Sequence, residues 1–132
     1  MKIALLDDYQ QIGIKSADWA SLAAGTEVNS FADTLADVDA LVQRLKPYDV
    51  IVAMRERTRF TAQVIDALPN LRLLVGTGGR NPSIDADACA RRNITLCAAH
   101  GLPTGESSTA EVAWALVLAL MKRIPQSDKA MR

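Results

Sequence analysis

A strand-to-helix turn in the middle of the chain reads LLVGTGGRNPSID, from Leu73 to Asp85. An aliphatic run enters a turn with three glycines in four positions, and a helix-like pattern leaves the turn. A short apolar run bounded by glycine is typical of a buried strand, and such a strand followed by a helix predicts one unit of a parallel sheet.

The same alternation extends along the whole chain. Continuous aliphatic strands joined by helices are typical of a parallel sheet that is covered on both faces. At 132 residues, this favours an α/β fold: one flavodoxin-like, doubly wound, five-stranded parallel sheet in the order 2-1-3-4-5. The expected strands span residues 2–7, 26–31, 48–54, 71–76 and 94–99, and the expected helices span residues 16–25, 37–47, 61–70, 83–93 and 107–125.

Composition limits the possible partners. Fifteen basic and fifteen acidic residues cancel, and no segment has the dense Lys/Arg pattern that nucleic acid requires. The N-terminus meets charge too early for a signal peptide, and the apolar run of residues 112–121 is about half a membrane span. Cys89 and Cys97 form no metal or redox motif, so we expect two buried, reduced thiols in a cytoplasmic protein without a metal site.

The last predicted helix has no polar side over Val112–Met121. A helix that is apolar all round must be buried all round. We therefore expect this segment to form an interface with a second domain or subunit, although a core helix with a wide apolar face is the simpler alternative.

The glycine turn is the first candidate binding site. Asn81 stands where the dinucleotide pattern G-x-G-x-x-G needs its last glycine, and the turn lacks the lysine of a phosphate loop. Closely spaced glycines can still present backbone N–H groups to an anion, and Arg80 and a helix beginning at Ser83 would add positive charge. A small carboxylate fits these features best, and a tight turn with an exposed arginine is the alternative.

Arginines follow the predicted strand of residues 48–54. Arg55 is nearest the strand end, so we expect it to border the cleft, whereas Arg57 and Arg59 are read as solvated loop residues. The lone histidine, His100, has no partner nearby in the sequence and is read as a polar surface residue.

Asp7 and Asp8 follow the first strand and raise a rival interpretation. Paired acids at this position suggest a receiver-like signalling domain that holds Mg²⁺. Such a domain also needs an acceptor aspartate after the third strand, where Met54 and Arg55 stand, and a lysine after the fifth strand, which is missing. We therefore expect Asp7 and Asp8 to be helix-start or solvated acids.

The second half of the chain carries a resemblance. The segments LPNLRLLVGTGGRNPSID, ARRNITLCAA and STAEVAWALVLALMKRIP follow one another with a characteristic order and spacing, and YDVIVAMRERTRF adds a weaker match. They resemble the N-terminal part of the D-isomer-specific 2-hydroxyacid dehydrogenases, including 3-phosphoglycerate dehydrogenase-like members.

The resemblance implies a substrate-binding portion of an NAD- or NADP-dependent oxidoreductase that interconverts 2-keto acids and D-2-hydroxy acids. It implies that the glycine turn binds the substrate carboxylate and that the loop after the third strand borders the same cleft. The implied substrate-binding residues are Met54, Arg55, Gly78, Gly79, Arg80 and Asn81. The resemblance also places the nicotinamide near Gly79 and the cofactor phosphates near Thr109.

In the turn, Arg80 and Asn81 follow two adjacent glycines, and the loop of residues 98–108 is longer and more glycine-rich than the family's usual version, so the family's contacts for this loop do not carry over. The resemblance divides the chain into a substrate-binding domain, residues 1–107, and an apolar linker and dimerisation helix, residues 108–132, that leads to an NAD-binding domain. It implies a homodimer formed through Val112–Met121.

The family's cofactor motif and catalytic arginine and histidine come after the position of Arg132. We therefore expect no catalytic residue in these 132 residues, and a truncated chain that is inactive alone. A stand-alone carboxylate-binding or regulatory module, and a receiver-like domain, remain as alternatives.

Overall fold

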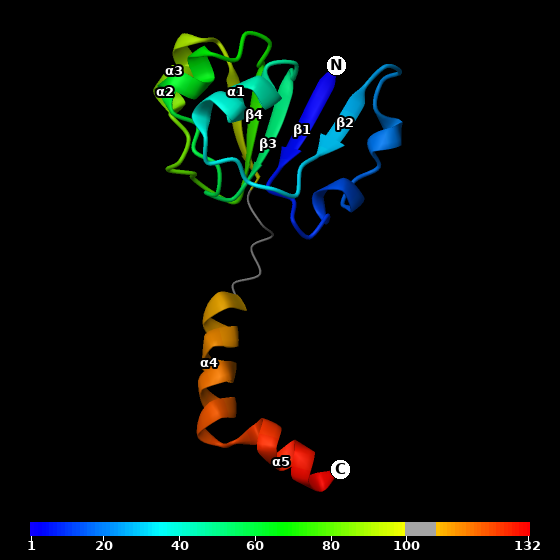
Figure 1. Ribbon diagram of the computed structural model, residues 1–132, viewed down its shortest axis with the longest axis vertical. Helices are drawn as coiled ribbons and strands as arrows, with labels where there is room; N and C mark the ends of the chain where they lie inside the picture. The colour runs from blue at the N-terminus through cyan, green and yellow to red at the C-terminus, as the bar shows by residue number, and fades with distance from the viewer. Residues whose placement is uncertain (100–107) are drawn as a thin grey trace. The chain divides into compact units, whose positions relative to one another are not determined.

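A computed structural model describes residues 1–99 and 108–132 (Figure 1). The chain divides into two compact units, one on each side of the junction between Gly101 and Leu102.

The first unit is built on a five-stranded parallel sheet in the order β2-β1-β3-β4-β5, as the sequence predicts. The register aligns Ala4, Ile51, Leu74 and Leu96 across four neighbouring strands. All five carboxyl ends therefore lie along one edge of the sheet, where ligands bind in open α/β folds. The strands are β1 (Lys2–Leu6), β2 (Glu27–Ser30), β3 (Val50–Met54), β4 (Leu73–Thr77) and β5 (Thr95–Ala99).

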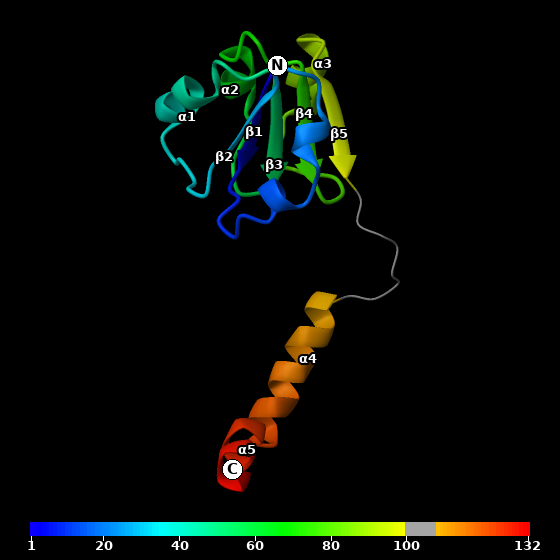
Figure 2. The same ribbon diagram turned by 90° about the vertical axis from the view of Figure 1, so that its right-hand side faces the viewer.

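Three helices gather on one face of this sheet (Figures 1 and 2). They are α1 (Val38–Leu45), α2 (Ala62–Asp66) and α3 (Ala86–Arg91). Each begins at a side chain that accepts a backbone N–H from its own first turn, namely Asp37, Thr61 and Asp85. Between these helices and the sheet lies a core of fully buried side chains, the largest being Phe60, Leu45, Ile51, Ile65, Leu68 and Leu74.

The connection between β1 and β2 lies against the other face (Figure 2), and here the predicted α-helix over residues 16–25 is wrong. Two short 3-10 turns, Gly13–Lys15 and Trp19–Ser21, take its place. Local hydrogen bonds compete with the helix, because Ser16 Oγ donates to the Ile12 carbonyl and the indole of Trp19 donates to the Gly13 carbonyl.

The two cysteines differ in exposure. Cys89 lies on α3 and is 1% exposed, and burial raises the pKa of its thiol. Cys97 on β5 is exposed, so the expectation that both thiols are buried is wrong. All five residues of the edge strand β5 are exposed.

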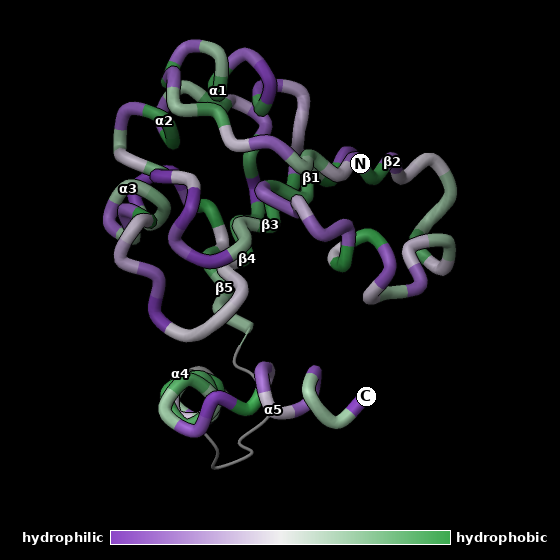
Figure 3. The backbone as a smooth tube through the Cα atoms, turned by 60° about the horizontal axis from the view of Figure 1, so that its bottom comes forward, coloured by the Kyte–Doolittle hydropathy of each residue, from purple (hydrophilic) through white to green (hydrophobic). Residues whose placement is uncertain are grey.

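The second unit consists of α4 (Ser108–Met121) and α5 (Ile124–Met131). The predicted helix of residues 107–125 ends early, because Arg123 adopts a left-handed conformation (φ 51°) and a new helix begins at Ile124, with Pro125 in its first turn. The residues of α4 itself are mostly apolar (Figure 3). Within this unit, Trp114 is 67% exposed and Leu120 is 76% exposed. Among the described helices, none combines the length and apolar character needed to span a membrane.

Candidate functional site

The carboxyl ends of β3 and β4 form the centre of the candidate site. Met54 ends β3, and Arg55 follows it in a left-handed conformation (φ 60°), which turns the chain sharply away from the sheet. The Arg55 N–H donates to Thr77 Oγ1 at 3.0 Å, so the last residue of β4 holds the first residue of the neighbouring loop. The two loops are thus joined at their bases.

Asn81 joins the same two loops a second time. Its side-chain amide donates to the Arg55 carbonyl at 2.7 Å, and its side-chain oxygen accepts the Ser83 N–H at 2.9 Å. The Ser83 hydroxyl also donates to the Glu56 carbonyl, at 3.3 Å. Both polar atoms of the Asn81 side chain are therefore engaged within the protein, and Asn81 acts as a positioning residue for both loops.

The glycine turn lies between these two anchors. Gly78 has a φ of 110°, which only glycine adopts readily, and its N–H donates to the Ala99 carbonyl on β5 at 2.8 Å. Gly79 and Arg80 are exposed, and their N–H groups donate to no acceptor in the described part of the chain. The Asn81 N–H likewise donates to no acceptor in the described residues, but Asn81 is only partly exposed, so the N–H groups of Gly79 and Arg80 are the most accessible of the expected turn donors.

The helix after the turn contributes less than the sequence suggests. α3 begins at Ala86, not at Ser83, and has six residues. The Asp85 carboxylate accepts the Ala88 N–H at 2.8 Å and places a negative charge at this helix end. The expectation that a helix beginning at Ser83 brings positive charge to the turn is therefore wrong, because the aspartate two residues later caps the helix.

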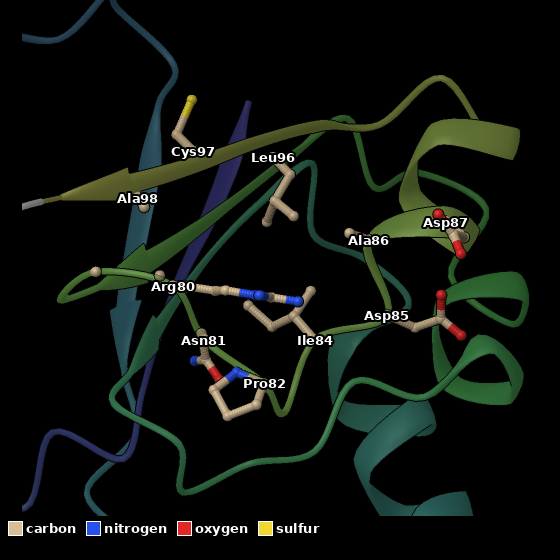
Figure 4. A pocket seen from close by; sticks show the side chains of 12 residues that line it. Arg80, Asn81, Pro82, Ile84, Asp85, Ala86, Asp87, Leu96, Cys97 and Ala98 are labelled. Atoms are coloured by element: carbon tan, nitrogen blue, oxygen red, sulfur yellow. The ribbon is translucent and has the colours of Figure 1, made fainter.

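Arg80 lines a different pocket from Met54 and Arg55. It extends across a pocket of about 550 Å³ on the helix side of the sheet, near Leu96 and Ile84 (Figure 4). Met54 and Arg55 line a different pocket of about 420 Å³. The structure therefore brings Met54 and Arg55 together, and it links them to the turn through Asn81 without bringing the Arg80 guanidinium to the same pocket.

Several residues that line the second pocket were not predicted from the sequence as site residues. Tyr9, Ile12 and Trp19 from the β1–β2 connection line it together with Met54 and Thr77. One signal was available for Tyr9, which follows β1 closely and so lies at the ligand-binding edge of the sheet. Trp19 carried no such signal, because it lies in the segment whose secondary structure was wrongly predicted.

Arg57 is exposed, as expected of a loop residue, but the protein also anchors its guanidinium. Its guanidinium donates to the Asp7 carbonyl at 2.7 Å and to the Tyr9 hydroxyl at 3.0 Å. It also stacks 4.2 Å from the centre of the Tyr9 ring. Arg57 therefore joins the β1 and β3 loops, whereas the Arg55 side chain is 71% exposed and Arg59 is exposed as expected.

Asp7 and Asp8 are each 1% exposed, so the expectation of solvated or helix-start acids is wrong. The Asp7 carboxylate accepts hydrogen bonds from the hydroxyls of Thr34 and Thr58. These bonds engage the carboxylate within the protein, as expected of a structural group rather than a receiver's metal ligand. Among the described residues, no group of three His, Cys, Asp or Glu side chains could hold a metal ion.

The Asp8 carboxylate organises the segment that follows it. It accepts the N–H groups of Ile12, Gly13 and Ile14 at 2.9 to 3.2 Å and the hydroxyl of Ser30 at 2.9 Å. Burial alone raises the pKa of Asp8, but these hydrogen bonds outweigh burial and hold the pKa below its usual value. Asp8 therefore stabilises the wall of the second pocket as a carboxylate.

Two expected residues fall at the edge of the described structure. His100 lies outside the described residues. Thr109 lies in the first turn of α4, and its side chain is outside the description.

Comparison with known proteins places the chain among dehydrogenases. The sequence pattern described as D-isomer specific 2-hydroxyacid dehydrogenase, catalytic domain, matches residues 3–124. A D-3-phosphoglycerate dehydrogenase of Archaeoglobus fulgidus is 36% identical over 94 residues, which are 71% of this chain and 17% of that protein.

Solved structures give the same result. A phosphoglycerate oxidoreductase of Vibrio cholerae is 38% identical with a TM-score of 0.75, over 90% of this chain and 36% of that one. An NAD-dependent formate dehydrogenase of Staphylococcus aureus, solved in complex with NAD, is 25% identical with a TM-score of 0.61, over 97% and 40% of the two chains. The chain thus spans well under half the length of these relatives. It belongs to the D-isomer-specific 2-hydroxyacid dehydrogenase family.

Proposed function

We propose that this chain is the substrate-binding portion of an NAD- or NADP-dependent oxidoreductase that interconverts 2-keto acids and D-2-hydroxy acids. The observation that carries the proposal is the pair of N–H groups of Gly79 and Arg80, which are exposed at the carboxyl edge of the sheet and donate to no acceptor in its described part. Such a pair of backbone donors suits a carboxylate.

In this proposal the substrate carboxylate binds the N–H groups of Gly79 and Arg80. The Asn81 side chain holds the turn against Arg55, which leaves only the Asn81 N–H to contact the substrate. Met54 and Arg55 border the remainder of the substrate, and Gly78 supports the turn through its bond to Ala99. Residues 1–107 form the substrate-binding domain, and residues 108–132 form the connection to a cofactor-binding domain.

The nicotinamide cofactor would supply or accept the hydride. Gly79 is exposed and has no side chain, so a ring could approach its backbone closely. We assign Gly79 and Thr109 to the cofactor's surroundings. These 132 residues include no G-x-G-x-x-G motif, so the chain tested alone should oxidise no NADH with pyruvate, glyoxylate or hydroxypyruvate.

We further propose a homodimer formed through Val112–Met121. Large apolar side chains cover this helix on every side, and Val112, Leu116 and Leu118 are each at least 50% exposed within their unit. The two cysteines are free, which fits a reducing, cytoplasmic location.

Calorimetric titration of the 132-residue chain with pyruvate tests the binding role. Saturable binding of one pyruvate per chain is the expected result. A titration without binding heat at several temperatures would contradict the proposal, and NADH turnover by the chain would contradict its inactivity alone.

A further inference from the structure

The pocket beside Met54 has a chemical character that bears on the substrate. Its volume of about 420 Å³ is ample for the side chain of a small acid. The β1–β2 connection contributes Ile12 and Trp19, and the sheet contributes Leu5, Val52 and Met54. Thr77 also lines it, and Gly79 follows Thr77 by two residues, or at most about 8 Å of chain. One small acid can therefore reach from the glycine turn into this pocket.

The wall formed by the β1–β2 connection is held in place before any ligand binds. Asp8 accepts three successive N–H groups, those of residues 12–14. The Trp19 indole donates to the Gly13 carbonyl at 3.2 Å. Gly13 itself packs so closely on the Met54 methyl group that an added Cβ would clash with it. A preformed apolar wall binds a matching side chain without the cost of ordering the wall.

The charged groups that line the pocket are largely engaged by the protein. Asp7 and Asp8 accept hydrogen bonds from protein donors, and the Arg57 guanidinium is held by the Asp7 carbonyl and the Tyr9 hydroxyl. Arg55 extends towards solvent, with the Glu56 carboxylate 4.0 Å from its Nε. A doubly charged phosphate in this pocket would therefore meet engaged cations and nearby carboxylates.

We propose that this pocket binds the side chain of a 2-keto or 2-hydroxy acid, and that this side chain is apolar and branched or aromatic instead of phosphorylated. Ile12, Trp19 and Met54 are the residues that determine this specificity. The inference rests on the proposed function, because it needs the carboxylate to bind at the glycine turn.

The test compares three probes with the 132-residue chain by calorimetry: glyoxylate, 4-methyl-2-oxopentanoate and 3-phosphoglycerate. Glyoxylate has no side chain, so it reports carboxylate binding alone. The branched acid should bind about tenfold or more tighter than glyoxylate, because an apolar pocket distinguishes substrates by their methyl and methylene groups. The phosphorylated acid should bind no tighter than glyoxylate.

Two variants locate the effect. Ile12→Asp places a charge in the pocket and should remove the advantage of the branched acid while leaving glyoxylate affinity unchanged. Leu22→Asp makes the same kind of change on the same connection, at a residue that does not line the pocket, and should alter neither affinity. In a Trp114→Phe chain, where Trp19 is the sole tryptophan, the branched acid should shift the tryptophan emission to shorter wavelength and glyoxylate should not.

The outcomes separate the two proposals. If glyoxylate binds and the branched acid binds no tighter, the pocket inference fails and carboxylate binding stands. Tightest binding of 3-phosphoglycerate, or an equal loss of both affinities in Ile12→Asp, would also overturn the pocket inference. If none of the three acids binds, both proposals fail.

Discussion

The side-chain amide of Asn81 donates a 2.7 Å hydrogen bond to the carbonyl oxygen of Arg55. These residues lie on loops that follow different strands, and the bond joins the glycine turn to the loop that borders the neighbouring pocket. Because both loops depend on one side chain, the geometry of the candidate site depends on a residue that need not touch the substrate.

Replacing Asn81 by alanine should therefore weaken ligand binding as well as the fold. The loss of two side-chain hydrogen bonds should lower the free energy of unfolding by about 1–3 kcal/mol. Pyruvate affinity should fall because Gly79 and Arg80 lose their fixed position. Urea unfolding and calorimetry measure the two effects.

Asn70 offers a matched control, because its side-chain amide also donates to a backbone carbonyl, that of Lys46, at 2.9 Å. Asn70→Ala should cost some stability and leave pyruvate affinity unchanged. Equal pyruvate affinity in the Asn81→Ala and Asn70→Ala chains would show that Asn81 does not position the site.

Asp8 should make stability depend on pH. Its folded-state pKa lies below the unfolded value of about 3.9. Its contribution is therefore present in full above about pH 5 and is lost as the pH falls through the folded-state pKa. An asparagine amide cannot accept all four hydrogen bonds, so Asp8→Asn should cost about 1–3 kcal/mol at pH 7 and less at pH 3. Urea unfolding at both pH values measures this, and a cost that does not shrink in acid would contradict the assignment.

Arg57 should contribute to the fold through Tyr9 and Asp7. Arg57→Ala removes two hydrogen bonds and a cation–π contact at 4.2 Å, so it should lower the free energy of unfolding by about 1–2 kcal/mol. Arg59→Ala, two residues away at an exposed position without a hydrogen bond or ion pair in the described part of the chain, should cost less than about 0.5 kcal/mol. Indistinguishable urea midpoints for the two variants would count against the anchoring role of Arg57.

We expect the chain to form a dimer through α4. Trp114, 67% exposed within its unit, is the largest apolar side chain on this helix. Trp114→Glu should convert a dimer into a monomer or make the chain insoluble, because a buried unpaired charge is costly. Sedimentation equilibrium measures the change. A wild-type chain that remains monomeric at micromolar concentration would refute the proposed dimer.

The sheet was predictable because its strands are continuous aliphatic runs such as Val50–Met54, whose burial depends little on context. The helix caps Asp37 and Thr61 also depend only on local sequence, because each side chain accepts an N–H group three residues ahead. The β1–β2 connection was not predictable, because its conformation depends on Asp8, whose carboxylate collects N–H groups up to six residues ahead. The helix-like pattern of residues around Trp19 gives no sign of these hydrogen bonds to Asp8.

Part of the candidate site was also predictable from the sequence, and part was not. Met54, Arg55 and the glycine turn follow strand ends, and the strand pattern itself brings them to one edge. The roles of Asn81 and Arg57 were not predictable, because each depends on a side-chain bond to a residue 26 or 50 positions away. The placement of Arg80 in a pocket that Met54 does not line likewise follows from three-dimensional packing.

A ¹H–¹⁵N spectrum of the 132-residue chain titrated with pyruvate tests directly whether the glycine turn binds the carboxylate. We expect saturable shifts that are largest for the backbone amides of Gly79 and Arg80, with little change at Gly78, whose N–H is already bonded to Ala99. Binding that leaves the Gly79 and Arg80 amides unmoved, or shifts that are largest outside residues 76–81, would contradict the assignment of the glycine turn as the carboxylate site.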